Sequence, residues 1–243
     1  MAGDLQGADE SGRPSPLFAL GGWLVAVLIL ALLLVAWQIF ATRPNMAVVL
    51  PRPGDVWTSF ADLMDQRVLW QATIATGRSW AAAFAVAAIL GIALGLVTGS
   101  GRALGALLSP AVLVFGAFPL PALAALFVLW MGLGTAAGAI TAGALLALFP
   151  IAAMVARSRP SPDAGLRLKG VFHAFEIGVV LALFGVVFTE MLASRGRLGS
   201  MVIELQSNFE NKRLLALVFY LWLLGLAAAL PFAFCRWISG IGR

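Results

Sequence analysis

The longest uncharged segment of the chain constrains its fold most. From Ala103 to Ala156 there is no Asp, Glu, Lys or Arg, and one helix needs only about 20 apolar residues to cross the hydrocarbon core of a bilayer. Trp130-Met-Gly-Leu-Gly134 interrupts the segment with two glycines, which favours a turn between two helices. A helix in lipid satisfies its own backbone amides. The segment therefore predicts two membrane crossings.

Composition extends this prediction to the rest of the chain. Of the 243 residues, 61% are hydrophobic and 11% are charged, and the mean hydropathy is +0.98. A soluble domain carries about 25% charged residues, so this chain has too few to cover a water-facing surface. We therefore predict an all-α integral membrane protein. The 16 basic residues are scattered between apolar runs, which argues against nucleic-acid binding despite the net charge of +5.

Charge-free length predicts about six transmembrane helices in one domain, residues 17–243, after a polar cytoplasmic N-terminus, residues 1–16. The helices are expected at about 17–41, 75–101, 103–130, 135–156, 171–192 and 214–236. The helix at 171–192 has the weakest support, because Glu176 and Glu190 stand near its two ends. An even number of crossings places both termini on one side. The basic loop from Arg157 to Lys169 slightly favours the cytoplasm for that side.

The segment between the first two crossings predicts an interfacial helix. Apolar residues at 56, 57, 60, 63 and 64 follow helical spacing among charged neighbours. Such a pattern is typical of an amphipathic helix that lies at the membrane surface. Leu50-Pro-Arg-Pro53 predicts an extended, rigid entry to this helix.

Gly91, Gly95 and Gly99 recur every fourth residue along the second predicted crossing. A stripe of small residues lets two helix backbones approach closely in lipid. Glycine is also common in membrane helices, but three glycines in register favour a packing face. The partner is another helix of this chain or a second subunit.

Prolines and ionisable residues at membrane depth are candidates for a transport pathway or gate. Two prolines interrupt the long uncharged segment, and broken helices line the pathway in transporters; an ordinary turn between two short buried helices is an equal alternative. Ionisable groups are costly in a bilayer unless they are paired or reach the surface. Arg78, Glu176 and Glu190 each stand near the end of a predicted helix, which favours side chains that reach the membrane surface over side chains paired inside the bilayer. The candidate pathway residues are Arg78, Pro119, Pro121, Trp130 and Glu190.

Catalytic and metal chemistry have little support. Cys235 and His173 are the single cysteine and the single histidine, which are too few for a zinc site. The chain has neither a Gly-x-x-x-x-Gly-Lys phosphate loop nor a nucleophile with a histidine base. We expect no enzyme activity, no metal and no cofactor, and any ATP would be used by a partner subunit.

Several short strings, in chain order, resemble the permease subunits of bacterial ABC importers, in the branch that serves nitrate, sulfonates, taurine and related solutes. They cover most of Leu50 to Leu230. The strings are Leu50-Pro-Arg-Pro-Gly-Asp-Val56, Thr76-Gly-Arg-Ser79 with Phe84 and Gly91 to Gly95, Phe118-Pro-Leu-Pro121, Leu129-Trp-Met-Gly-Leu-Gly134, Phe149-Pro-Ile151, Thr189-Glu-Met191, Gly196-Arg-Leu-Gly199 and Asn208-Phe209.

The resemblance implies an ABC importer permease-like bundle in the bacterial inner membrane. Two permease subunits, identical or different, would form the pathway for a small solute, by resemblance an anion of the nitrate, sulfonate and taurine class. Two cytoplasmic ATPase subunits would drive transport, and a periplasmic solute-binding protein would deliver the solute.

The loop before the fifth helix departs from the family pattern. It normally carries a Glu-Ala-Ala…Gly motif on a coupling helix that docks into the ATPase, whereas Ser161 to Gly170 has Asp-Ala in place of Glu-Ala and lacks several helical turns. Prolines at 160 and 162 leave little helix, so an accessory or structural subunit derived from such a permease, with weak or no coupling, is the alternative function. The candidate coupling residues are Arg157, Arg159, Asp163, Ala164, Gly165, Leu168 and Gly170.

Overall fold

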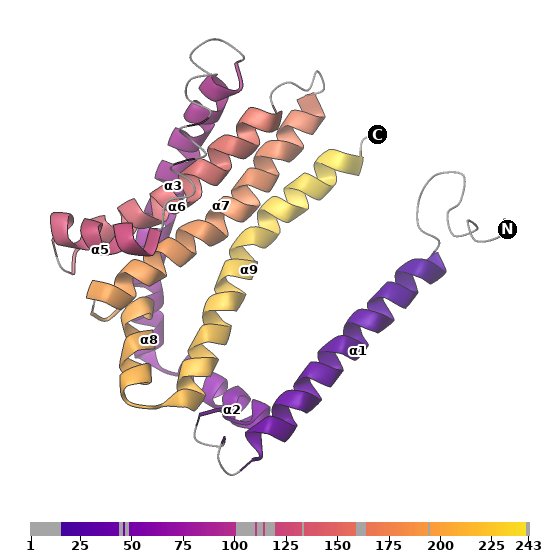
Figure 1. Cartoon of the computed structure of the whole chain (residues 1–243), viewed down its shortest axis with the longest axis vertical. Helices are drawn as coiled ribbons and strands as arrows, with labels where there is room; N and C mark the ends of the chain where they lie inside the picture. The colour runs from indigo at the N-terminus through magenta and orange to yellow at the C-terminus, as the bar shows by residue number, and fades with distance from the viewer. Residues whose placement is uncertain are drawn as a thin grey trace. The chain divides into compact units, whose positions relative to one another are not determined.

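The computed structural model describes residues 16–43, 46, 49–100, 110, 114, 120–132, 134–158, 164–193 and 195–241. The chain divides into two compact units, Met1–Thr58 and Ser59–Arg243. All regular structure in the described part is helical, which confirms the expected all-α membrane fold. The helices are α1 (Pro16–Ala41), α2 (Pro53–Met64), α3 (Arg67–Thr98), α5 (Leu120–Met131), α6 (Ala136–Ser158), α7 (Ala164–Ala193), α8 (Leu198–Ser207) and α9 (Asn211–Ile241) (Figure 1).

Five of these helices are long and apolar enough to cross a membrane, counted over the described residues: α1, α3, α6, α7 and α9. They lie at five of the six expected positions. However, α3 begins at Arg67 rather than near residue 75, and α7 begins at Ala164 rather than near residue 171. The third expected crossing, 103–130, falls mostly outside the described residues, and its described end is the 12-residue α5.

The first unit consists mainly of α1, whose described side chains are apolar on all sides. Leucines and valines from Leu24 to Val35 are 45–65% exposed, which is unfavourable in water and favourable in lipid. At the end of α1 the Trp37 indole N–H donates to the Pro51 carbonyl at 3.0 Å. This bond fixes the turn that leads into α2. The predicted polar terminus, residues 1–15, lies outside the described residues.

The amphipathic helix predicted between the first two crossings is α2. In the second unit, Leu63 is 2% exposed and the Phe60 ring packs edge-to-face on Phe219 of α9, with 5.5 Å between the ring centroids. The C-terminal part of α2 therefore packs against protein.

The second unit is a bundle in which α3, α6, α7 and α9 lie side by side (Figure 1). The glycines of α3 face successive turns of α6 in the same order: Gly91 lies beside Leu148, Gly95 beside Ala152 and Gly99 beside Ala156. The two helices are therefore parallel, so the chain returns across the bundle between them. On its other side α6 contacts α7, which runs antiparallel to it.

The stripe of small residues on α3 sets the distance to α6. A Cβ atom built on Gly95 would lie 2.7 Å from the Ala152 carbonyl oxygen and 2.7 Å from the Val155 Cβ. Such contacts are too close for a side chain, so the backbones meet there directly. The partner of the glycine stripe, which the sequence left open, is α6 of the same chain.

Two glycines make the turn between α5 and α6. Gly132 and Gly134 have φ angles of +95° and +79°, a conformation that costs other residues free energy. The Thr135 hydroxyl donates to the carbonyl oxygens of Met131 and Gly132, at 3.1 and 2.9 Å. The break in the long uncharged segment thus lies at the Trp130–Gly134 string.

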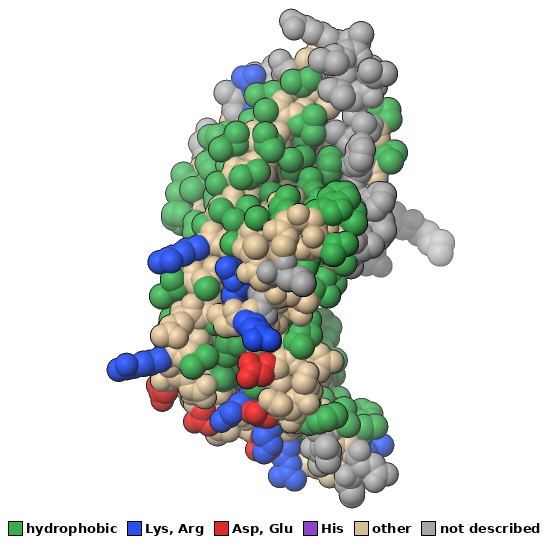
Figure 2. All heavy atoms as spheres, turned by 90° about the vertical axis from the view of Figure 1, so that its left-hand side faces the viewer, with side chains coloured by type: hydrophobic (Ala, Val, Ile, Leu, Met, Phe, Trp, Pro, Cys, Tyr) green, Lys and Arg blue, Asp and Glu red, His purple; other side chains and the backbone are tan. Residues whose placement is uncertain are grey.

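Charged and hydrophobic side chains are separated on the surface. Most charged side chains visible in Figure 2 gather over the lower half of that face, and hydrophobic side chains cover much of the upper half. Large exposed apolar residues occur on three helices of the bundle, among them Ile89 of α3, Phe184 of α7 and Trp222 of α9. Lipid is the surrounding that such a surface requires.

Candidate functional site

A buried carboxylate occupies the last turn of α7. Glu190 is 0% exposed, although it belongs to a helix that is long and apolar enough to cross a membrane. An unpaired carboxylate would be very costly there. Partners from α3 and from the start of α8 therefore surround it.

The Glu190 carboxylate is fully paired. Its Oε1 atom lies 3.1 Å from Nη1 of Arg197, and its Oε2 atom accepts hydrogen bonds from the Thr76 hydroxyl at 2.8 Å and from the Gly199 backbone N–H at 3.3 Å. Arg197 also donates to the Ser79 hydroxyl at 2.7 Å. This Glu190 network joins α3, the end of α7 and the start of α8.

The network also caps α8. The first backbone N–H groups of a helix have no partner within it, and here two of them find one in the network. Leu198 N–H donates to the Thr76 hydroxyl at 3.0 Å, and Gly199 N–H donates to the Glu190 carboxylate. A negative charge at a helix N-terminus is also favourable toward the helix dipole. One carboxylate thus neutralises Arg197 and holds the first turn of α8 in place.

Gly199 allows the first turn of α8 to approach the last turn of α7 closely. A Cβ atom at this position would collide with the Val187 carbonyl oxygen and would lie 2.5 Å from the Glu190 Cβ. The first turn of α8 therefore rests directly on the last turn of α7, and a side chain here would push the N–H away from the carboxylate.

Of the five candidate pathway residues, the structure describes the side chains of Arg78, Trp130 and Glu190, and these three do not form one site. Arg78 lies on the exposed side of α3 and takes no part in the Glu190 network, while Trp130 of α5 is 69% exposed and packs edge-to-face on Phe127. Pro119 and the side chain of Pro121 lie outside what the structure describes. Among the candidates whose side chains the structure describes, Glu190 alone belongs to a buried polar cluster.

Two of the ionisable residues are paired rather than reaching for the membrane surface, which corrects the sequence-based expectation. Glu190 is buried in its network, and Glu176 in the fourth turn of α7 lies 3.1 Å from Nη2 of Arg236 on α9. His173 lies 3.3 Å from the same carboxylate. The Glu176–Arg236 pair was missed because it joins two helices whose paired residues are 60 positions apart in the sequence.

The segment expected to form a short coupling loop is mostly helical. Arg157 lies in the last turn of α6, while Gly165, Leu168 and Gly170 lie in the first turns of α7. The loop prediction is therefore wrong for residues 164–170, where no proline follows Pro162 and leucine, lysine and arginine favour a helix. Ala164 is the first residue of α7, and Arg159 and Asp163 lie outside the described residues.

The two helix ends that flank this segment are in contact. A Cβ atom at Gly170 would collide with the Ser158 hydroxyl, so α6 and α7 touch here. Leu166 and Leu168 are each 48% exposed, and Arg167 is exposed between them. This end of the bundle presents apolar and basic side chains on a helical surface.

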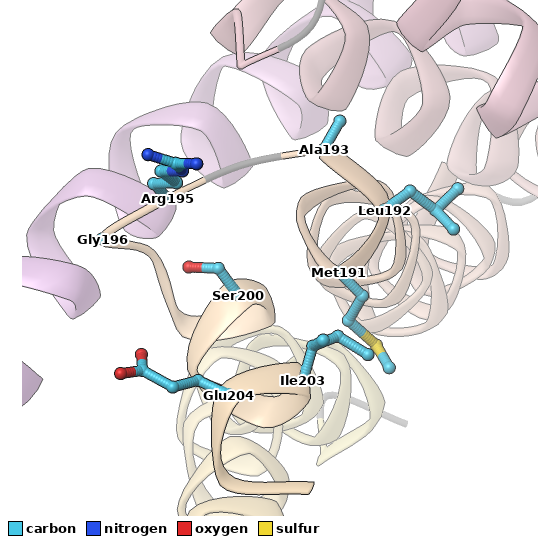
Figure 3. Close-up of a pocket in the computed structure, with 8 residues that line it drawn as sticks. All are labelled: Met191, Leu192, Ala193, Arg195, Gly196, Ser200, Ile203 and Glu204. Atoms are coloured by element: carbon cyan, nitrogen blue, oxygen red, sulfur yellow. The ribbon is translucent and has the colours of Figure 1, made fainter. Parts of the chain in front are cut away.

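A pocket of about 570 Å³ lies beside the Glu190 network, where α7 ends and α8 begins (Figure 3). The residues that line it are Met191, Leu192, Ala193, Arg195, Gly196, Ser200, Ile203 and Glu204. Within the described residues there is no group of three or more His, Cys, Asp or Glu side chains that could hold a metal ion.

Sequence reasoning missed Arg197, Thr76 and Ser79 as partners of Glu190. Both segments had been noted only as strings shared with transporter permeases. The available signal was chemical, because two hydroxyl residues stand one helical turn apart in an apolar helix, and an arginine follows a helix end that carries a glutamate.

Two proteins that the comparison found resemble the chain in sequence. The riboflavin transport system permease protein RibX of Chloroflexus aurantiacus is 30% identical over 205 residues, which are 75% of this chain and 76% of that protein. A probable ABC transporter permease protein of Haemophilus influenzae is 29% identical over 160 residues, 65% of this chain and 64% of that protein. No family model matches the chain.

Both relatives are transporter permeases rather than enzymes. Neither name supports the nitrate, sulfonate and taurine branch that the short strings suggested, since one relative is named for riboflavin. The resemblance therefore holds at the level of ABC permeases, and the branch assigned from the strings was too narrow.

Proposed function

Because the chain belongs to the permease subunits of ABC transporters, we propose that it forms the translocation pathway of an importer for a small solute. The observation that carries this proposal is the 30% identity over three quarters of both chains. The bundle of α3, α6, α7 and α9, with its apolar surface, supports it as a multi-pass membrane subunit.

The partners follow from the family and from what the chain lacks. The sequence has no nucleotide-binding loop, so the proposed ATPase is a separate subunit that docks where α6 ends and α7 begins. A second permease subunit, identical or different, completes the pathway, and a periplasmic binding protein delivers the solute. The helical start of α7, with exposed Leu166, Arg167 and Leu168, offers the ATPase a firmer surface than a loop would.

The proposed solute is a small organic molecule or anion, and two chemistries compete. The relative named for riboflavin favours a ring-containing organic solute. The short strings favour nitrate, a sulfonate or taurine, and exposed Arg78 is the one candidate pathway residue with a positive charge.

Uptake into reconstituted vesicles tests the function. The chain is reconstituted with an ABC ATPase subunit and a solute-binding protein of the same organism, and labelled riboflavin, taurine and nitrate are offered outside vesicles that contain ATP. We expect ATP-dependent accumulation of one of the three solutes, and none in vesicles without this chain. If the ATPase co-purifies with the chain but no ATP-dependent transport of these or related solutes occurs, the accessory-subunit function replaces the permease function.

The proposed orientation places both termini and the α6–α7 connection in the cytoplasm. In a variant in which Cys235 is replaced by Ser, a cysteine is introduced at exposed Ser207 of α8 or at exposed Arg157 of α6. A membrane-impermeant maleimide applied to intact spheroplasts is expected to label Ser207→Cys and to leave Arg157→Cys unlabelled, while both react after permeabilisation. The reverse pattern would overturn the orientation.

A further inference from the structure

The pocket beside the Glu190 network lies at the boundary of a membrane-spanning helix. Its wall includes the last turn of α7, whose apolar span runs from Gly165 to Ala193, and the residues that follow it, up to the second turn of α8. Polar lipid head groups meet a membrane protein at this level, where a hydrophobic span ends. The volume of about 570 Å³ falls within the range of about 300–1,000 Å³ found for small-molecule sites.

The pocket has one polar side and one apolar side. In Figure 3 the side chains of Arg195, Ser200 and Glu204 lie along one side, and those of Met191, Leu192 and Ile203 lie along the other. An occupant must therefore be amphiphilic.

The two charges on the polar side differ from the other charges nearby. Arg197 is paired with Glu190, and Arg213 with Glu210. Arg195 and Glu204 are exposed, and within the described part of the chain neither has an oppositely charged partner. The pocket thus offers a free guanidinium and a free carboxylate to the same occupant.

The polar side is held in place by the backbone around it. The Ser200 hydroxyl accepts a hydrogen bond from Arg197 N–H at 3.0 Å and donates to the Arg197 carbonyl at 2.8 Å. Because Arg197 is itself fixed by the Glu190 network, the loop that carries Arg195 and the helix that carries Glu204 are held at a set spacing. A preorganised site of this kind binds with less loss of entropy.

An apolar stripe leads from the pocket along α7. Val180, Phe184 and Leu192 are 41–60% exposed, and half-buried Phe188 stacks on Phe184 with 6.3 Å between the ring centroids. Four-residue spacing keeps these side chains along one side of the helix, and the helix crosses the hydrocarbon core. Acyl chains of an amphiphile in the pocket would lie along this stripe.

We propose that the pocket binds a phospholipid whose head group carries both a phosphate and an ammonium group, with phosphatidylethanolamine as the occupant. The phosphate pairs with Arg195, because a guanidinium donates to phosphate oxygens in a matched geometry. The ammonium group pairs with Glu204, and the acyl chains contact Leu192 and Phe184. This inference depends on the membrane span and the pocket, not on the proposed transport function.

Lipid binding to the purified chain tests the proposal by native mass spectrometry. The probes are phosphatidylethanolamine, phosphatidylglycerol, which lacks the ammonium group, and the soluble head-group analogue glycerophosphoethanolamine. We expect phosphatidylethanolamine to bind best. Arg195→Gln should lower the affinity for both lipids about fivefold, because one basic residue at a lipid surface contributes about 1 kcal/mol. Glu204→Gln should abolish only the preference for phosphatidylethanolamine over phosphatidylglycerol.

Matched controls come from the exposed pair at the start of α9. Glu210→Gln and Arg213→Gln remove the same charges close by without touching the pocket, and they should leave both affinities unchanged. Equal binding by the wild type and the Arg195→Gln/Glu204→Gln variant would overturn the proposal. Binding of the soluble analogue as tightly as the lipid would also overturn the proposal, because it would indicate a site for a soluble zwitterion. Loss of bound lipid when the chain forms a dimer would overturn it too, because it would assign the pocket to a second copy of the chain.

Discussion

Replacement of Glu190 by Ala is expected to lower the free energy of unfolding by about 3–5 kcal/mol, the cost of leaving one partner of a buried ion pair alone. The variant removes the charge opposite Arg197, whose side chain is only 17% exposed, and the acceptor of the Thr76 hydroxyl and the Gly199 N–H. Unfolding of the purified chain in mixed micelles, with increasing denaturing detergent, measures the change.

A second ion pair of the same chain provides the control. Arg213 and Glu210 lie 2.8 Å apart, but their side chains are 47% and 38% exposed. Arg213→Ala should therefore cost less than about 1 kcal/mol. The double variant Glu190→Ala/Arg197→Ala should cost less than the sum of the two single changes, because neither charge is then left alone. A loss for Glu190→Ala no larger than that for Arg213→Ala would show that the network contributes little.

The network explains how α8 is held between α7 and α9. The ten residues of α8 would form only a marginally stable helix in isolation. Thr76, Glu190 and Gly199 replace this missing stability with contacts to α3 and α7. The same contacts hold the Arg195–Gly196 loop beside the pocket, so loss of Glu190 should disturb the pocket along with the fold.

The membrane character of the fold could be read from the sequence because it depends on local properties. Length, absence of charge and the two glycines near Trp130 are properties of single segments, and they located the long helices to within several residues. The glycine stripe at Gly91, Gly95 and Gly99 likewise follows from helical spacing. Helical spacing could not identify the helix that packs against these glycines, because the choice of partner depends on how the helices of the whole chain are arranged.

The candidate site was harder to predict because it depends on contacts between distant residues. Thr76 and Glu190 are 114 positions apart, and Arg197 and Ser79 are 118 apart. Each of these residues, taken alone, fits a place near a membrane surface. The start of α7 was misjudged for another reason: Pro160 and Pro162 were given weight over the helix-forming residues that follow them.

The backbone contact between α6 and α7 predicts a second large effect, from Gly185→Leu. A Cβ atom on Gly185 would lie 2.7 Å from the Gly143 Cα and 3.0 Å from both the Ala142 oxygen and the Gly143 nitrogen. All three neighbours are backbone atoms, which cannot turn aside as a side chain could. The helices must separate, and we expect a loss of about 3 kcal/mol, the upper part of the usual range for overpacking.

The matched change is Gly77→Leu on α3, where a Cβ atom would meet nothing within 4 Å. This variant should unfold like the wild type or at slightly higher detergent concentration, because leucine favours a helix more than glycine does.

The backbone contact between α6 and α7 also explains why the loss of stability should extend beyond α7. A Cβ atom on Gly143 would lie 3.0 Å from the Ala83 Cβ of α3, so moving α6 at this level disturbs its contacts with both neighbours. Equal stability of the Gly185→Leu and Gly77→Leu variants would mean that α6 and α7 do not meet backbone to backbone at Gly143.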